Sequence, residues 1–245
     1  MLKAFNRFFK VSVLRIYRDL YKSRGLKLVV KYFLECHYFD IANSTDTHKM
    51  VSKQDMKVDS DYFINSLMYM ASWTSVLEET NFFVKNKIMH PSVTYKYIDV
   101  GCGKGKAVLV ARKNKIVGGD RNNYVGIDFE NNLVSIAKKN SLKVFGDEGN
   151  FMFADVAYFD FNAVGENLIF FLYNPFDEEV MNKMLMSING SHIILVYVNP
   201  LNRNLLAKYG FTSRLKRDGW HPNLSYEVFE LKQDSSTIVD RRKNG

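Results

Sequence analysis

The sequence predicts an α/β fold: a doubly wound, mostly parallel seven-stranded sheet with a C-terminal antiparallel hairpin, preceded by a helical N-terminal region. Three observations predict it. From residue 91 onward, short apolar runs alternate with helical stretches, which is typical of a parallel sheet covered on both faces. A glycine-rich turn joins the first run to the helix that follows it. The last two runs have no helix between them, so we expect them to pair as a hairpin.

The length of 245 residues suits one large α/β domain with a helical appendage. We expect the helical region over residues 1–90, with a basic amphipathic arm over 1–31 and a substrate lid over 36–83. A cofactor-binding domain should follow over residues 91–233, with a polar tail over 234–245. The composition, with 47% hydrophobic residues and 4 prolines, excludes collagenous, low-complexity and disordered classes.

Residues 1–90 have helical character, with breaks at residues 23–25 and 43–47 and a further helical stretch over 61–83. His90-Pro91 ends this region, because the residue before a proline is pushed out of helical backbone angles.

Seven apolar runs then predict the strands, and three helical stretches separate some of them. The strands are expected over residues 95–100, 124–129, 151–156, 167–173, 192–198, 211–216 and 225–232. The helices are expected over residues 106–113, 133–140 and 177–188.

The excess positive charge is confined to the N-terminal arm. Residues 1–31 contain nine lysines and arginines and one acid, Asp19, and this accounts for the whole net charge of +8. The balanced remainder does not indicate a nucleic-acid groove across the molecule. At 100° per residue, most of the basic side chains of the arm lie opposite an apolar stripe. The stripe consists of Leu2, Phe5, Phe9, Val13, Ile16 and Leu20.

Several interpretations of this arm stay open. It can pack its apolar stripe on the body, lie on a membrane surface, or contact nucleic acid or an acidic partner, of which nucleic acid is less favoured. It also resembles an organelle transit peptide. No run approaches the roughly 20 apolar residues of a spanning helix. Two cysteines, Cys36 and Cys102, fit a reducing compartment, so we expect a cytoplasmic protein, with membrane association through the arm as an addition.

The segment Asp99-Val100-Gly101-Cys102-Gly103-Lys104-Gly105 directly follows the first predicted strand. Glycines spaced by two allow a tight turn that brings backbone N–H groups against a ligand at a helix N-terminus. The spacing differs from the dinucleotide fingerprint G-x-G-x-x-G, and the sequence contains no G-x-x-x-x-G-K-[ST] phosphate loop. This disfavours a nicotinamide-dependent enzyme.

Two acids are expected at the ends of the next two strands. Asp128 lies 23 residues after Gly105, and Asp155 ends the third predicted strand. A carboxylate at Asp128 can accept both hydroxyls of a ribose, each bond contributing about 1.5–3 kcal/mol because the acceptor is charged. Asp155 can meet an adenine amino group. Ligands of open α/β sheets collect at this carboxyl edge.

Together these motifs resemble the class I S-adenosylmethionine-dependent methyltransferases over about residues 91–233. The resemblance implies a methyltransferase with S-adenosylmethionine as its cofactor. It implies that Asp99 and the glycine turn hold the methionine part, that Asp128 holds the ribose, and that Asp155 and Val156 hold the adenine. The expected cofactor-binding residues are Asp99, Gly101, Cys102, Gly103, Gly105, Asp128, Phe129, Asp155, Val156 and Asn174.

The fourth predicted strand ends as Tyr173-Asn174-Pro175-Phe176. This turn resembles the Asn-Pro-Pro-Tyr/Phe turn of amine methyltransferases with one proline fewer. It is also similar to the Asn-x-Phe turn of the histone-lysine methyltransferases that lack a SET domain. The Asn174 amide oxygen and a backbone carbonyl can accept the hydrogens of a neutral amine and aim its lone pair. Phe176 or Tyr173 can wall the substrate.

The expected catalytic residues are therefore Tyr173, Asn174, Pro175 and Phe176, and the expected acceptor is an amine nitrogen, for example of a protein lysine. Two alternatives stay open: an O-methyltransferase of a sugar or other small molecule, and a non-catalytic cofactor-fold scaffold at a membrane surface. Asn174-Pro175 also has a plain structural interpretation as a strand-end turn with Phe176 in the core. We favour that interpretation for the second pair, Asn199-Pro200.

The remaining chemistry-bearing residues point to no further site. The five histidines show no metal-ligand spacing, so no metal is predicted. Asp177, Glu178 and Glu179 are expected to favour the N-terminus of the following helix through its dipole. Cys102 lacks an identifiable base, so a nucleophilic role is not expected.

Within the expected lid, Tyr38-Phe39-Asp40 and Asp46-Thr47 resemble a segment ahead of the cofactor domain in some bacterial methyltransferases. Tyr69 and Trp73 are candidates for contacts to the acceptor, with core packing favoured for Trp73.

Overall fold

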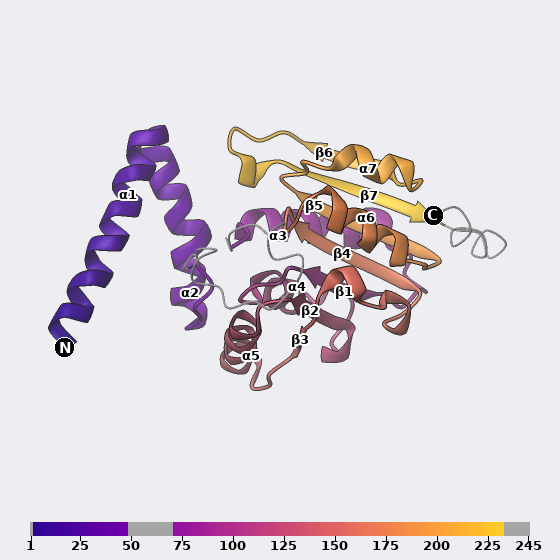
Figure 1. Ribbon diagram of the computed structural model, residues 1–245, viewed down its shortest axis with the longest axis horizontal. Coiled ribbons are helices and arrows are strands. Elements are labelled where there is room, and N and C mark those ends of the chain that lie inside the picture. Colours follow the sequence, from indigo (N-terminus) through magenta and orange to yellow (C-terminus); the bar gives the residue numbers. More distant parts are fainter. Residues whose placement is uncertain (1, 49–70, 233–245) are drawn as a thin grey trace.

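The computed structural model describes residues 2–48 and 71–232, and for residues 2–16 the backbone only (Figure 1). Seven strands form one sheet in the order β3-β2-β1-β4-β5-β7-β6. Strands β1 to β5 are parallel, while β7 is antiparallel to both of its neighbours, β5 and β6. The strands are β1 (Lys96–Val100), β2 (Tyr124–Asp128), β3 (Asn150–Phe153), β4 (Asn167–Tyr173), β5 (His192–Val198), β6 (Thr212–Arg217) and β7 (Tyr226–Lys232). The predicted fold class is confirmed, including the C-terminal hairpin.

Helices cover both faces of the sheet, as expected for central strands such as β5, in which every residue is buried. One face packs against the N-terminal helices together with α3 (Thr74–Phe83), α4 (Lys106–Lys113) and α5 (Asn131–Phe145). The other packs against α6 (Glu178–Ser187) and α7 (Arg203–Lys208). The carboxyl ends of β1 to β5 therefore meet at one edge between two apolar layers.

The strands β4 and β5 and the helix α4 have the predicted bounds. Helix α5 extends beyond its predicted bounds at both ends, and α7 was not predicted, because its six residues are too short to establish a helical period. The predicted third strand is too long. β3 ends at Phe153, and the carboxylate of Asp155 accepts the backbone N–H of Ala157 at 2.9 Å to cap a short 3-10 turn. Asp155 thus follows the strand instead of ending it.

The N-terminal region is helical, with the predicted breaks. Helix α1 (Leu2–Tyr32) kinks at Arg24 and Gly25, where Gly25 has a φ of 69°. A π-helical turn (Phe33–His37) leads directly into α2 (Tyr38–Asn43). Figure 1 shows the first half of α1 standing apart from the sheet, while the second half and α2 lie beside the body. No helix of the described residues combines the length and apolarity needed to cross a bilayer.

The structure also describes two further residues that carried an expectation from the sequence, Asp177 and Trp73. Asp177 caps the N-terminus of α6, with its carboxylate accepting the backbone N–H of Val180 at 3.1 Å, as expected for this acidic group. Trp73 is only 2% exposed and stacks on His221, so it belongs to the core. Residues 61–70 of the predicted helix, Tyr69 among them, and the predicted tail lie outside the described residues.

Candidate functional site

The turn between β1 and α4 requires glycine at three positions. Gly101, Gly103 and Gly105 have φ angles of 73°, 51° and 84°, a left-handed region that L-residues avoid. A Cβ on Gly101 would lie 2.6 Å from the Cβ of Pro175, and a Cβ on Gly105 would lie 2.8 Å from the ring of Phe151. The glycine turn therefore packs directly against the turn that follows β4.

Two acids are buried below the glycine turn. Asp128 accepts the backbone N–H groups of Gly103 at 2.7 Å and Glu130 at 2.9 Å. Burial raises the pKa of Asp128 to about 6, although these two donors act against the shift. Burial, and after it the charge of Asp128, raises the pKa of Asp99 well above its usual range. The backbone N–H of Phe129 also stabilises the charged carboxylate of Asp128. The two carboxylate oxygens hold four lone pairs between them, so these three donors leave an acceptor position for a ligand hydroxyl.

Seven of the predicted site residues meet at one pocket beside the glycine turn. Its walls are mostly apolar, and two carboxylates lie among them. The lining residues are Gly101, Ile127, Asp128, Phe129, Ala154, Asp155, Val156, Pro175, Phe176 and Val180. Apolar walls suit a flat aromatic base, and the carboxylates suit hydroxyl or amino groups, so the residues present fit an adenosine group.

The other predicted cofactor residues do not line this pocket. Asp99 and Cys102 are buried beneath the turn, and Gly103 and Gly105 form its backbone. Burial raises the pKa of the Cys102 thiol well above its usual range, which keeps the thiol protonated.

Asn174 follows β4 in a left-handed conformation, with a φ of 39°. Its side chain is buried, and its Oδ1 accepts a hydrogen bond from the Tyr197 hydroxyl at 3.0 Å. Tyr197 lies on β5, where it is in register with Leu172 of β4. Tyr197 was not predicted from the sequence. The available signal was a hydroxyl-bearing side chain near the end of a mostly aliphatic strand, next to the strand that precedes Asn174.

The two aromatic residues proposed to wall the acceptor lie on opposite faces of the sheet. Phe176 packs on the face covered by α6 and lines the pocket beside the glycine turn. Tyr173 packs on the face covered by α3 and α4, where burial, and then nearby Cys36, raises the pKa of its hydroxyl above the usual range. Tyr173 and Phe176 therefore do not form one wall of a single acceptor site. Tyr173 lies on the face of the sheet that the N-terminal helices cover.

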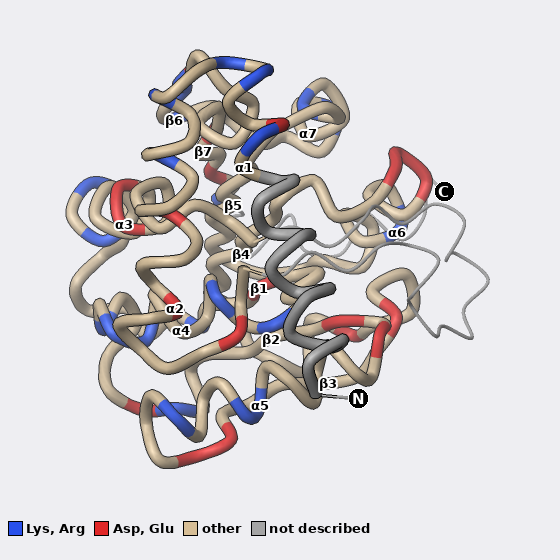
Figure 2. Tube along the Cα trace, turned by 90° about the vertical axis from the view of Figure 1, so that its left-hand side faces the viewer, with Lys and Arg blue, Asp and Glu red and all other residues tan. Residues whose placement is uncertain are grey.

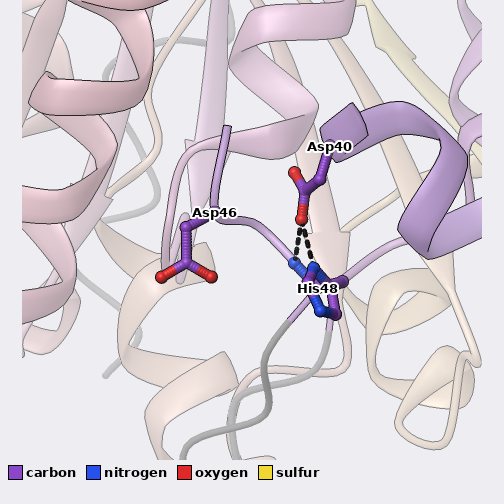
Figure 3. A group of neighbouring side chains, drawn as sticks. All are labelled: Asp40, Asp46 and His48. Carbon is purple, nitrogen blue, oxygen red and sulfur yellow. Dashed lines mark hydrogen bonds and ion pairs between the residues drawn. The ribbon is translucent and has the colours of Figure 1, made fainter. Parts of the chain in front are cut away.

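Asp40 anchors the N-terminal region through one buried carboxylate (Figure 3). It accepts hydrogen bonds from the hydroxyls of Thr45 at 2.6 Å and Thr47 at 2.8 Å, from the backbone N–H groups of Thr47 and His48, and from the His48 ring Nδ1 at 2.5 Å. Burial alone would raise the pKa of Asp40, but the hydrogen bonds from His48 and Thr45 outweigh it and hold the pKa well below its usual range. We call Asp40 with residues 45–48 the Asp40 lock.

The Asp40 lock is attached to the glycine turn. The Asn140 side chain accepts the backbone N–H of Asp46 at 3.0 Å and donates to the backbone carbonyl of Lys104 at 3.1 Å. The Lys104 ammonium lies 3.5 Å from the Asp46 carboxylate. In the sequence, Asp40, Asp46 and Thr47 stood out only by resemblance. The contacts of Asp46 to Asn140 and to Lys104 were not predicted, because they span 94 and 58 residues of sequence.

Asp40, Asp46 and His48 each offer one ligand atom within 4.8 Å of the others, a spacing that a metal ion could use. The sequence analysis did not find this group, because its three residues have no ligand spacing typical of a metal motif. Both oxygens of Asp40 already accept hydrogen bonds, and Asp46 has an ammonium group beside it. Figure 3 shows the Asp40 carboxylate directed at His48, with no interaction drawn to Asp46. This donor set favours a hydrogen-bonded lock over an ion.

Comparisons with known proteins agree with this geometry. The protein family described as "Methyltransferase domain" matches residues 91–231. A search of the curated proteins found no significant match.

Several solved structures are similar to the chain at low sequence identity. Magnesium protoporphyrin IX methyltransferase from Synechocystis PCC 6803 has 16% identity and a TM-score of 0.48, over 66% of this chain and 79% of that chain. A ribosomal protein L11 methylase from Lactobacillus delbrueckii subsp. bulgaricus has 14% identity and a TM-score of 0.45, over the same shares. TrmN from Thermus thermophilus has 14% identity and a TM-score of 0.45, over 63% of this chain and 47% of that chain. None of these likenesses identifies an acceptor for this chain.

The Asp40 lock makes a testable contribution to stability. We expect Asp40→Asn to lower the free energy of unfolding at pH 7 by about 2–4 kcal/mol, because an amide turns a donor toward donors that are already buried. Asp46→Asn is the control. Its side chain is 37% exposed and forms a long ion pair, at 3.5 Å, with Lys104, so we expect a loss below about 1 kcal/mol. Urea unfolding of the two variants measures both values.

The pH dependence gives a second readout of the same residue. Because the pKa of Asp40 is lower in the folded chain than its ordinary 3.8, its contribution is present above about pH 4 and is lost as the pH falls below that value. The Asp40→Asn variant should lack this part of the acid-induced loss. Equal losses in the two variants, or identical acid profiles of Asp40→Asn and wild type, would contradict the assignment.

Proposed function

The chain belongs to the methyltransferase domain family and is an S-adenosylmethionine-dependent methyltransferase; on this premise we propose that its acceptor is an amine nitrogen held at Asn174–Phe176. The observation that carries the proposal is the fixed Asn174 side chain. Its oxygen is held by Tyr197, and Pro175 and Phe176 next to it line the pocket beside the glycine turn. An amide acceptor thus lies next to the cofactor pocket.

The chemistry explains why an amide suits this position. When bound, S-adenosylmethionine supplies an electrophilic methyl group on a sulfonium. A neutral amine is already nucleophilic and needs orientation more than a strong base. The Asn174 carbonyl oxygen has two lone pairs. Among the described residues, Tyr197 donates to one of them. The second can accept an N–H of the amine and aim the nitrogen lone pair at the methyl group. The methylated amine would then carry a positive charge and release its surplus proton to solvent.

The cofactor contacts are proposed from the same pocket. Asp128 would accept the ribose hydroxyls, with Phe129 beside it, and Asp155 with Val156 would meet the adenine. All four line the pocket, and Asp128 is held in place by two backbone N–H groups. The backbone of the glycine turn, with Asp99 beneath it, would receive the methionine part at the N-terminus of α4.

The acceptor class is tested with the full chain and S-adenosylmethionine carrying a tritiated methyl group. The probes are a lysine-containing peptide and spermidine as amines, and a disaccharide as the hydroxyl acceptor. Label on nitrogen, located by mass spectrometry, supports the proposal. Label on oxygen alone would establish the O-methyltransferase alternative. Binding of S-adenosylmethionine without transfer to any probe would favour a non-catalytic scaffold.

Asn174→Gly is the sharpest variant, because glycine accepts the φ of 39° without strain and removes only the amide. We expect kcat for the amine probe to fall by about 100-fold or more, with the Kd for S-adenosylmethionine changed by less than about threefold. Asn199→Gly is the matched control: Asn199 also ends a strand before a proline with a positive φ, of 50°, and should keep its kcat. Equal kcat losses in both variants would reduce Asn174 to a structural turn residue.

Tyr197→Phe tests the positioning of Asn174. Loss of the hydroxyl frees the amide to rotate, so we expect kcat to fall about tenfold while KM for the amine stays nearly constant. A purely structural role would lower the free energy of unfolding and leave kcat unchanged at a temperature where the variant is folded.

Cofactor binding should weaken in acid because of Asp128. Its pKa of about 6 means that the free site gains a proton below pH 6, and a neutral carboxyl is a weaker acceptor for the ribose hydroxyls. We expect the Kd for S-adenosylhomocysteine, measured by calorimetry, to rise up to about tenfold per pH unit between pH 6 and pH 5. Asp128→Asn should bind more weakly at pH 7 and lose this pH dependence. A wild-type Kd that stays constant from pH 7 to pH 5 would refute the assignment of Asp128.

A further inference from the structure

The outer surface of α1 and α2 carries an unusual number of exposed apolar side chains. Of the fourteen large hydrophobic residues exposed among those described, seven lie between residues 21 and 41. We call six of them the apolar stripe: Leu26, Val30, Phe33, Leu34, Tyr38 and Ile41. Their exposed fractions range from 41% for Phe33 to 69% for Ile41. Scattered single residues of this kind are normal, but a continuous run on one segment indicates a contact surface.

The spacing places the apolar stripe on one face of the helical segment. Leu26, Val30, Leu34 and Tyr38 follow one another at intervals of four, and Phe33 and Ile41 each lie three residues after a member of this row. The opposite face is also apolar, with Leu28 and Phe39 buried in the core. Within the part of the chain that the structure describes, the body covers the face of Leu28 and Phe39. The apolar stripe stays exposed, and its members Val30 and Leu34 line a groove beside Trp220.

The charges along the same helix indicate the chemistry of the missing partner. Lys22, Arg24 and Lys27 are exposed on the segment that carries the apolar stripe. Residues 1–31 hold nine basic side chains and one acid, whereas the rest of the chain is balanced. The partner is therefore anionic as well as apolar. Figure 2 looks onto the side of the molecule on which α1 and α2 lie.

An aromatic residue from the other end of the chain completes this surface. Trp220, which is 37% exposed, lies in the loop between β6 and β7. The Lys27 ammonium lies 4.8 Å from its ring centroid, and the Arg24 guanidinium donates to its backbone carbonyl. An indole flanked by cations next to an apolar stripe is typical of side chains at the boundary between lipid headgroups and acyl chains.

We propose that α1 and α2 dock this protein on an anionic lipid bilayer. The apolar stripe enters the boundary between headgroups and acyl chains, and the lysines and arginines contact the lipid phosphates. Nucleic acid would satisfy the charges but leave the apolar stripe in water. A second copy of this chain would cover the apolar stripe but place two basic arms together. The bilayer satisfies both features, and the proposal is independent of the acceptor.

The test is co-sedimentation of the full chain with vesicles of phosphatidylcholine alone or mixed equally with phosphatidylglycerol. We expect binding to the anionic vesicles at least tenfold tighter than to the neutral ones, and weaker as salt is raised. In the unmodified protein, anionic vesicles should shift tryptophan emission to shorter wavelengths, and Trp220→Phe should remove most of the shift, because Trp73 is already buried. Equal binding to both vesicle types, or no binding, would overturn the proposal.

A matched pair of triple variants identifies the surface. Leu26→Gln, Val30→Gln and Leu34→Gln together should weaken binding at least tenfold, and these side chains are at least half exposed, so the fold is retained. The control replaces three equally exposed residues of the body, Leu142, Met186 and Leu201, with Gln and should bind as wild type. Wild-type vesicle binding by the first variant would overturn the proposal. Two further results would overturn the proposal if the wild type did not bind vesicles. One is a lower oligomeric mass of the first variant than of the wild type, measured by light scattering, and the other is tight binding of DNA by the wild type.

Discussion

The contact between the glycine turn and the Asn-Pro-Phe turn is the constraint on which the site depends. Gly101 has no room for a side chain, because a Cβ there would lie 2.6 Å from the Cβ of Pro175. This contact closes the carboxyl edge of the sheet between β1 and β4. The two strands are neighbours in the sheet although their first paired positions, Lys96 and Leu168, lie 72 residues apart in the sequence. The pocket lies beside the contact and takes residues from both turns. A bulkier residue at Gly101 would therefore separate the two turns and change the pocket as well.

The second consequence of this packing is electrostatic. The edge buries two acids, Asp99 and Asp128, and burial raises the pKa of both. Two buried carboxyl groups are unfavourable for folding unless hydrogen bonds compensate for the lost water. For Asp128 the protein supplies two backbone N–H groups, which leaves lone pairs for a hydroxylated ligand. Burial has removed water from the Asp128 carboxylate, and the hydroxyl groups of a ligand can replace the lost hydrogen bonds. This replacement is one physical reason for ligand affinity at this edge.

The sequence predicted the sheet well because each central strand is a short apolar run and each turn carries its own signal. The glycines, Asp128 and Asn174 could be placed at one edge for the same reason, since parallel strands bring their carboxyl ends together. The missed features involve side chains that meet only in the folded chain. Tyr197 is ordinary within its strand, and it meets Asn174 only through the register of β4 and β5. Asp40 looks like any helix residue until residues 45–48 fold back onto it.

The N-terminal region divides at the kink of α1 into two parts with different physical tasks. After the kink, its groups complete the glycine turn: the buried Lys106 ammonium donates to the backbone carbonyl of Glu35, and Asp46 lies beside Lys104. Those two lysines are nearly inaccessible to water, so they depend on these acceptors. Before the kink, the backbone of α1 leaves the body (Figure 1). The part after Gly25 thus both contacts the glycine turn and carries the apolar stripe, while the part before Gly25 carries most of the positive charge of the arm.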